Sequence, residues 1–369
     1  MTDGTTAGKA AGRIYALNEG VRVFRSGDEI RFRKGVWSFN EAIVRLTGQA
    51  EPVVRFFGAF YERLIAAGQV DVDVLAVELG STAEALASYC ELLDNLKRQQ
   101  FLHDGAERDV TRVVSALLGG NLSGFEQYVG TPRPVLFLAD SPYARRAAQA
   151  IAAEVHLPLD FLDEETIRAL AQADLTTRTD AVATMEALGR FEKIFAPYAC
   201  VLGCVAAPNL TLLRNLNRLL VQAEKPLILG LIDGPFLSVL STLATQSGCF
   251  ECFEQRLLAR LEDTVVYHRF VESAAQAPAP GPWLAPAVHM LTAAVLSEGY
   301  LYSTLSMLRL AGRIINVYLP LLEIQVQDLL RVPYCPACGF ISKAQMNEMY
   351  SSTKRLVDEM LTKVEIVEG

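Results

Sequence analysis

The spacing of apolar residues changes along the chain and predicts two kinds of structure in succession. Apolar and polar residues alternate on both sides of residues 26–28, as they do in a β-hairpin. Between 51 and 100, apolar residues recur every three or four positions in three stretches, which predicts three helices. Ser81, with Glu84 three residues later, has the capping-box arrangement for the last helix. A small sheet with three helices predicts a winged-helix domain at 14–105.

Beyond residue 106 the pattern alternates between continuous apolar runs and helical periodicity. The runs that read as strands lie at 134–139, 157–163, 199–207 and 226–232. Buried parallel strands are apolar on both faces, and strand–helix alternation predicts a doubly wound parallel sheet. Two antiparallel strands are expected within 312–338, and an amphipathic helix over about the last 25 residues. The sequence therefore predicts an α/β domain over 106–369, and a disordered tail at 1–13.

Composition restricts the class of protein. The chain has 369 residues, of which 51% are hydrophobic and 21% charged. We therefore expect two globular domains, each with its own hydrophobic core. A formal net charge of -8 offers no general basic surface for phosphates, so no nucleic-acid partner is expected. The N-terminus lacks the apolar core of a signal peptide, and the most apolar stretch, 225–244, is interrupted by Asp233, Gly234 and Pro235. We expect a cytoplasmic protein without a membrane partner.

Four of the seven cysteines form two Cys-x-x-Cys pairs. The pairs are Cys249 with Cys252, and Cys335 with Cys338. Four thiolates make a closed tetrahedral zinc site, so the sequence predicts a structural zinc that ties the end of the chain to its middle. The alternative is that one pair is a redox motif and the other is incidental. The remaining cysteines lie in apolar patterns and are expected in the core: Cys90, Cys200 and Cys204.

The first strand of the second domain is not followed by a phosphate-binding turn. A doubly wound nucleotide-binding domain needs glycines there, so that its backbone can approach phosphate at the helix N-terminus. Asp140 and Ser141 stand in that place, and 135–151 contains no glycine. Arg145 and Arg146 could bind an anion, but exposed arginines are common. The chain has no Walker loop, catalytic triad or metal-hydrolase motif, so no catalytic residue is assigned.

The region from 200 to 256, together with the second cysteine pair in 330–339, resembles the ThiF-like fold of the ubiquitin-activating superfamily. The matching features are a strand, a helix with Arg214 and Asn217 as a spacing variant of Arg-x-x-x-Asn, a strand, and a Cys-x-x-Cys pair. More narrowly, the chain resembles the ThiF-like partner proteins of YcaO cyclodehydratases, such as the streptolysin-associated component. In that family the N-terminal winged helix is a RiPP recognition element, which binds the leader of a ribosomally made precursor peptide.

The resemblance implies specific roles for residues. The four paired cysteines would be zinc ligands. The strand near 37–46 and the helix over 82–100 would frame the leader groove, which gives these peptide-binding candidates: Trp37, Phe39, Ile43, Leu46, Leu86, Tyr89 and Leu93. Adenylating members of the superfamily carry an acidic residue where this chain has Ala206, Ala207 and Pro208. ATP and Mg²⁺ are therefore expected on the YcaO partner alone.

Three functional hypotheses follow. The first is a non-catalytic, leader-binding scaffold that presents a precursor peptide to an ATP-using YcaO enzyme forming thiazole and oxazole precursors. The second is a ThiF-like adenylating enzyme that acts on a peptide or carrier-protein terminus. The third is a winged-helix transcription regulator, which the acidic composition disfavours. The sequence leaves open whether the protein forms a homodimer.

Overall fold

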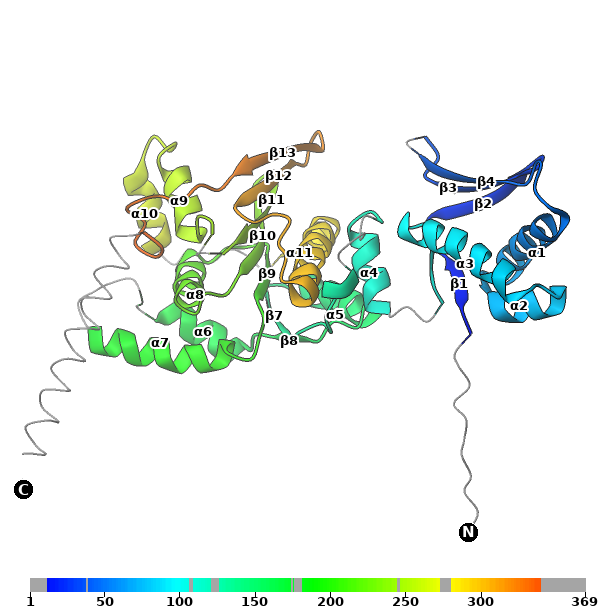
Figure 1. The fold of residues 1–369 in the computed structure, drawn as a ribbon. Helices are drawn as coiled ribbons and strands as arrows, with labels where there is room; N and C mark the ends of the chain where they lie inside the picture. Colours follow the sequence, from blue (N-terminus) through cyan, green and yellow to red (C-terminus); the bar gives the residue numbers. More distant parts are fainter. Residues whose placement is uncertain are drawn as a thin grey trace, which may run out of the picture. The chain divides into compact units, whose positions relative to one another are not determined.

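The computed structural model describes residues 12–339, with gaps at 38, 106–108, 121–125, 174, 176–180, 244–245 and 273–279 (Figure 1). It divides into two compact units, Met1–Val129 and Gly130–Gly369. The sequence placed this division at 105/106. Helix α4 (Asp109–Leu117) belongs to the first unit, because Arg112 pairs with Glu19 at 3.0 Å and the Ser115 hydroxyl donates to Gln100 at 3.3 Å.

The first unit contains two small antiparallel sheets and three further helices. The predicted hairpin is formed by β2 (Val21–Ser26) and β3 (Glu29–Lys34), and β4 (Asn40–Arg45) adds a third strand. The second sheet has the order β5-β1-β6, from Gln69–Asp71, Ile14–Leu17 and Leu102–Asp104. The helices are α1 (Glu51–Ala67), α2 (Val72–Leu79) and α3 (Ala83–Arg98). Helix α1 ends at Gly68, whose φ of 72° suits glycine.

Helix α3 begins one residue later than the sequence suggested. Thr82 is the N-cap, and its hydroxyl accepts from the amide of Ala85 at 3.3 Å. Both Ser81 and Thr82 can cap a helix, and the backbone selects the residue whose oxygen reaches the third amide of the first turn. Glu84 is then the second helical residue, one position short of closing a capping box.

The second unit is built on a seven-stranded sheet of order β13-β12-β11-β10-β9-β7-β8. The parallel part consists of β8 (Leu159–Phe161), β7 (Val135–Ala139), β9 (Val201–Val205) and β10 (Leu227–Asp233), as the apolar runs predicted. The antiparallel part consists of β11 (Phe236–Thr242), β12 (Arg313–Tyr318) and β13 (Glu323–Asp328). The sheet is therefore mixed. Strand β11 was not predicted separately, because Gly234 and Pro235 make a tight turn inside one apolar stretch.

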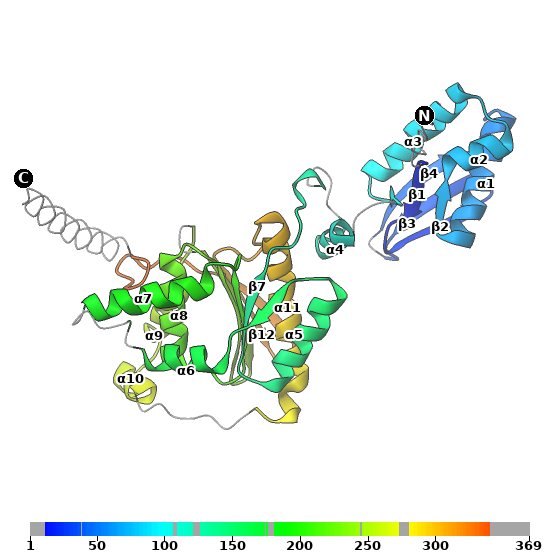
Figure 2. The ribbon, with the colours of Figure 1, turned by 90° about the horizontal axis from the view of Figure 1, so that it is seen from below.

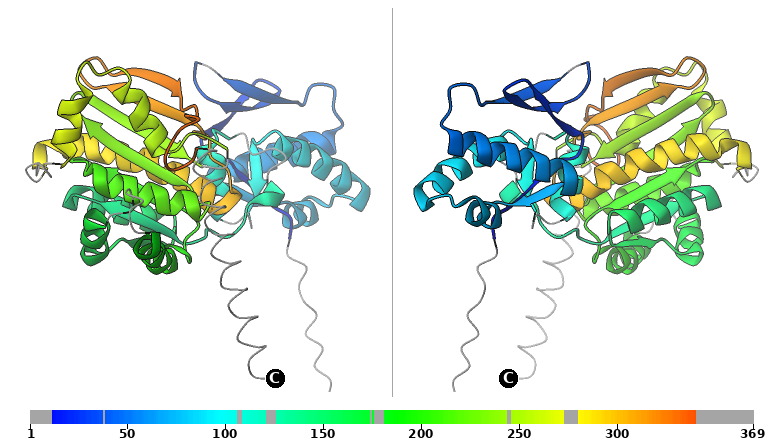
Figure 3. Two further views of the ribbon diagram at one scale, coloured as in Figure 1. Left: turned by 90° about the vertical axis from the view of Figure 1, so that its left-hand side faces the viewer. Right: turned by 90° about the vertical axis from the view of Figure 1, so that its right-hand side faces the viewer.

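Helices cover both faces of this sheet (Figure 2). Helices α5 (Pro142–Glu154) and α11 (Ala285–Leu305) lie on one face. Helices α6 (Glu164–Gln172), α7 (Ala181–Phe195) and α8 (Leu210–Gln222) lie on the other. Figure 3 shows α11 running across the strands. It packs closely because Gly299 has no side chain: a Cβ there would lie 2.6 Å from the Leu202 side chain.

The remaining described elements are short. Helices α9 (Phe250–Leu258) and α10 (Thr264–Glu272) follow β11, and single 3₁₀ turns occur at Glu126–Tyr128 and Pro282–Leu284. No helix among the described residues is long and apolar enough to cross a membrane. Of the expected tail at 1–13, residues 1–11 lie outside the described residues, and so does the expected C-terminal amphipathic helix.

Candidate metal centre and peptide surface

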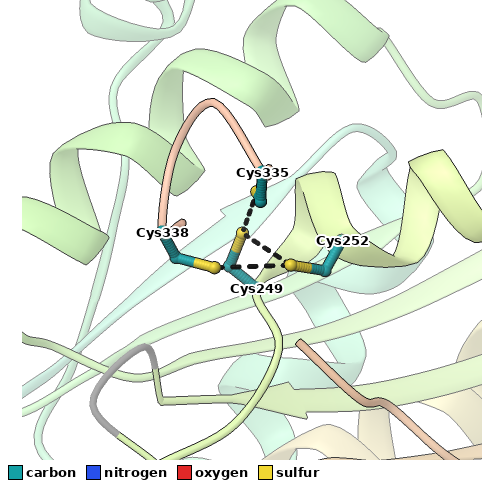
Figure 4. Close-up of side chains that lie close together, drawn as sticks. All are labelled: Cys249, Cys252, Cys335 and Cys338. Carbon is teal, nitrogen blue, oxygen red and sulfur yellow. Dashed lines mark hydrogen bonds between the residues drawn. The ribbon is translucent and has the colours of Figure 1, made fainter. Parts of the chain in front are cut away.

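The two cysteine pairs meet at one point of the second unit (Figure 4). Cys249 is the N-cap of α9, and Cys252 lies in its first turn. Cys335 and Cys338 lie on turns beyond β13. The segment before them, expected to be a strand, is an irregular connection from Leu329 onward. All four side chains are buried, and their sulfurs lie within 4.8 Å of one another.

The sulfur positions fit a tetrahedral ion. Zn–S bonds of about 2.3 Å would place tetrahedral sulfurs about 3.8 Å apart. The Cys249 sulfur lies 3.9 Å from that of Cys252 and 3.6 Å from that of Cys335, and the Cys252 and Cys338 sulfurs are 3.3 Å apart. Four thiol ligands form a soft, closed donor set that suits structural zinc. Because their four sulfurs lie close together, the two cysteine pairs form one candidate metal site, as the sequence predicted.

Two glycines allow the backbone to reach this geometry. A Cβ on Gly339 would lie 2.5 Å from the carbonyl oxygen of Cys335, and the Gly339 amide donates to that same oxygen at 2.9 Å. A Cβ on Gly248 would lie 2.9 Å from the carbonyl oxygen of Leu330. A side chain at either position would collide with backbone, which cannot move aside as a flexible side chain can, so it would distort the geometry around the cysteines.

A polar network attaches α8 to α9 beside the cysteines. Arg214 forms a two-pronged ion pair with Glu254, at 2.8 and 2.7 Å, and Arg218 pairs likewise with Glu251, at 2.8 and 3.0 Å. The Asn217 amide lies 3.5 Å from the Cys249 sulfur, and its oxygen accepts from the backbone of Phe250 at 2.9 Å. Arg214 and Asn217 are thus committed to holding α9 in place.

The thiols of the cluster differ from those of the isolated core cysteines. Hydrogen bonds from Cys249 and the other two thiols lower the pKa of Cys252, whereas donation toward Cys252 raises the pKa of Cys249. The pKa of Cys338 is lowered as well. Burial is the main cause that raises the pKa of Cys200 and of Cys204 to about 12, which keeps these core thiols protonated and unreactive.

The edge of the sheet where a nucleotide would bind is closed by the protein itself. Strand order reverses between β7 and β9, which is where open α/β sheets bind ligands beyond the carboxyl ends of the strands. There the Asp140 carboxylate accepts from the amides of Ala206 and Ala207, both at 2.7 Å. Ser141 caps α5 by accepting from Ala144, and Pro142 has no amide hydrogen to offer a phosphate.

The structure separates the seven peptide-binding candidates into three groups by their exposure. Trp37, Phe39 and Ile43 are exposed, at 94%, 51% and 38%, on the β3–β4 connection and on β4. Leu86 is partly buried. The other three lie in the core of the first unit: Leu46, Tyr89 and Leu93. Tyr89 and Leu93 lie on the inward face of α3, which is the face that helical periodicity marks.

Sequence reasoning missed several residues of the exposed surface. Strand β4 is an edge of its sheet, and the outward faces of β2 and β3 present Phe24, Arg31 and Arg33. The Arg33 guanidinium lies 3.6 Å from the centre of the Phe39 ring. The alternation of polar and apolar residues along β3 predicts that Arg31 and Arg33 are exposed, because they alternate with the buried Ile30 and Phe32.

Comparisons with known proteins give structural matches only. No protein-family model matches the chain, and no curated protein sequence matches it. A heterocyclase solved with substrate and cofactor aligns with a TM-score of 0.58 and 13% identity, over 89% of this chain and 40% of its own. The heterocyclase TruD gives 0.47 and 15%, over 89% and 43%, and E. coli MccB gives 0.45 and 17%, over 88% and 97%.

The first of these matches establishes a similarity of fold. Neither unit alone makes up nine-tenths of the chain, so the alignment with the heterocyclase includes residues of both. At 13% identity the likeness concerns backbone arrangement and not chemistry. The chain spans about two fifths of the heterocyclase it matches, so most of that protein has no counterpart here.

Proposed function

We propose that this protein is a zinc-containing, leader-peptide-binding scaffold of an azoline-forming heterocyclase. In this proposal the first unit, with a winged-helix-like arrangement, binds the leader, and the ThiF-like second unit positions it for a YcaO-type partner. The partner would use ATP and Mg²⁺ to cyclise the precursor. The observation that carries the proposal is the fold match to a heterocyclase over 89% of this chain but only 40% of that one.

The geometry of the second unit favours a scaffold over an adenylating enzyme. The switch point of its sheet is occupied by the contact of Asp140 with the amides of Ala206 and Ala207. The first βα connection has neither glycines nor a free helix N-terminus for phosphate. In this proposal, ATP use belongs to the YcaO-type partner.

Peptide binding is supported by the first unit. An extended leader can add to the free edge of β4 through main-chain hydrogen bonds, which is a common mode of peptide recognition. Trp37 and Phe39, at the β3–β4 connection, offer exposed aromatic contacts. Tyr89 and Leu93 are buried residues of helix α3. In this proposal they hold α3 against the core and do not contact the peptide.

Reconstitution tests the proposal. The purified chain, a YcaO-type cyclodehydratase and a short precursor peptide from the same source are combined with ATP, and the precursor is followed by mass spectrometry. We expect loss of one water per ring only when all three proteins are present. The chain alone should bind the fluorescent leader without turning over ATP. Exchange of pyrophosphate into ATP by the chain alone would instead support the adenylating alternative.

A further inference from the structure

A cavity of about 300 Å³ in the first unit is used by none of the functions above. It lies between the β1–β2 turn, the end of β3 and the C-terminal end of α4. Four glycines line it: Gly20, Gly35, Gly119 and Gly120. Beside exposed main chain, its walls carry two cationic side chains, Lys34 and Arg112, one carboxylate, that of Glu19, and apolar atoms.

Lys34 enters the cavity without a carboxylate partner. Among the described residues, its ammonium has one acceptor, the carbonyl oxygen of Gly120 at 3.5 Å, and it is partly buried. A Cβ on Gly120 would lie 2.4 Å from the Lys34 Nζ, so glycine at this position is what admits the ammonium. Burial lowers the pKa of Lys34, as expected for a charge that has lost water without gaining a counter-ion.

The second cation is already neutralised. Arg112 pairs with Glu19 at 3.0 Å and lies 3.8 Å from Asp109. Within the described part of the chain, Lys34 is therefore the cation of this cavity that has no carboxylate partner. A single negative charge would balance it, whereas a dianionic phosphate would meet Glu19 with only one cation free to bind it.

We propose that this cavity is a binding site for a single carboxylate group, held by the Lys34 ammonium. The carboxylate can come from an acidic side chain of a bound peptide or from a free organic acid. Exposed Val36 and Trp37 stand two and three residues after Lys34, so a peptide reaching the β3–β4 connection would pass the residue that carries the charge. The site does not depend on the proposed scaffold role.

The experiment uses the full chain with ¹⁵N-glycine labelling, so that NMR reports the four lining glycines. Sodium acetate is titrated against sodium chloride at constant ionic strength. A blocked acetyl-Ala-Glu-Ala-amide peptide is compared with its Gln counterpart. We expect saturable shifts of lining glycines with acetate or with the Glu peptide, but not with chloride or the Gln peptide. Acetate binding identifies a free acid as sufficient, and binding of the peptide alone identifies the side-chain source.

Variants separate binding from a structural role. Lys34→Met should abolish the shifts, or weaken binding at least tenfold, and Lys34→Arg should retain them. Lys97→Met is the matched control, because Lys97 belongs to the same unit, is exposed and pairs with Asp104 at 3.4 Å. If Lys34 only caps the C-terminal end of α4, no probe shifts the glycines and Lys34→Met lowers the melting temperature. Equal shifts with chloride, or shifts that survive Lys34→Met, also overturn the proposal.

Discussion

The Asp140 carboxylate accepts a hydrogen bond from the amide of Ala207 at 2.7 Å, and so links the end of β7 to the end of β9. The same oxygen accepts from Ala206 at 2.7 Å. This contact occupies the point of the sheet at which related architectures bind ligands. It supplies an acceptor within the chain for two amides that would otherwise face that point.

Removing that carboxylate should destabilise the second unit. Asp140→Ala leaves two amides without their acceptor, which we expect to cost about 1–3 kcal/mol. Urea unfolding followed by circular dichroism measures the change. The control is Asp160→Ala, which removes an exposed hydrogen bond from the Tyr198 hydroxyl at 3.0 Å and should cost less. Equal losses in the two variants would contradict a special role for Asp140.

Removal of the metal should unfold the connection between helix α9 and the segment that carries Cys335 and Cys338. We expect about one zinc per chain in the native protein, and none after Cys252→Ser or Cys338→Ser, because three sulfurs do not close the site. Elemental analysis with thermal unfolding tests this. Cys200→Ala is the control and should keep its zinc, since Cys200 lies in the core apart from the cluster. Zinc retained in either Ser variant would exclude this ligand set.

Acid should release the metal. Protons compete with zinc for the four thiolates, so affinity falls as pH is lowered from about 7 to about 5. A chromogenic chelator added during a pH titration measures release. Because release needs protonation of several sulfurs, it should be steeper than a one-proton curve. A metal content that does not change over this range would argue against thiolate ligation.

Gly339→Ala should weaken the metal site without touching a ligand. The added Cβ would meet the carbonyl oxygen of Cys335 at 2.5 Å, and neither is at the end of a flexible side chain. We expect at least tenfold weaker zinc binding in a chelator competition. Gly27→Ala in the hairpin of the first unit is the comparison: it is strained by a φ of 60° but has nothing within 4 Å of the new atom. Its zinc affinity should be unchanged.

The two ion pairs between α8 and α9 should respond to loss of one partner. The carboxylates of Glu251 and Glu254 are 5% and 7% exposed, whereas Arg218 and Arg214 keep 18% and 20%. Because the arginines are partly hydrated, we expect Glu251→Gln to cost about 2–3 kcal/mol, below the value for a fully buried pair. Adding Arg218→Met should recover part of the loss, and a double-mutant cycle in urea measures the coupling. Strict additivity would mean that the pair does not interact.

Substitutions in the first unit should separate the peptide surface from the core. Trp37→Ala removes an exposed ring, so we expect leader binding to fall at least tenfold while stability changes by less than about 0.5 kcal/mol. Leu93→Ala removes a fully buried side chain and should cost about 2–5 kcal/mol. Fluorescence anisotropy with a labelled leader and urea unfolding report the two effects. Unchanged leader affinity in Trp37→Ala would remove this loop from the peptide surface.

The sequence alone determined the local elements and the chemistry of the cysteines. Alternation predicted the β2–β3 hairpin, and continuous apolar runs predicted the parallel strands, because burial on one or both faces leaves its period in the chain. The spacing of Cys249 with Cys252, and of Cys335 with Cys338, suggested one four-sulfur site. The strands and the hairpin depend on residues that are close in sequence. The metal site could be predicted because few metal ions favour four thiolate ligands.

The tertiary structure decided what depends on distant neighbours. Tyr89 and Trp37 are both aromatic, yet Tyr89 stacks on Phe56 at 4.3 Å in the core while Trp37 is 94% exposed. The end of the first unit was misplaced because Arg112 finds Glu19 far back in the chain. The closure of the sheet by Asp140 likewise needs the amides of Ala206 and Ala207. Periodicity predicts whether a residue lies on the inward or the outward face of its helix or strand. Only tertiary packing decides which residues of different elements contact one another.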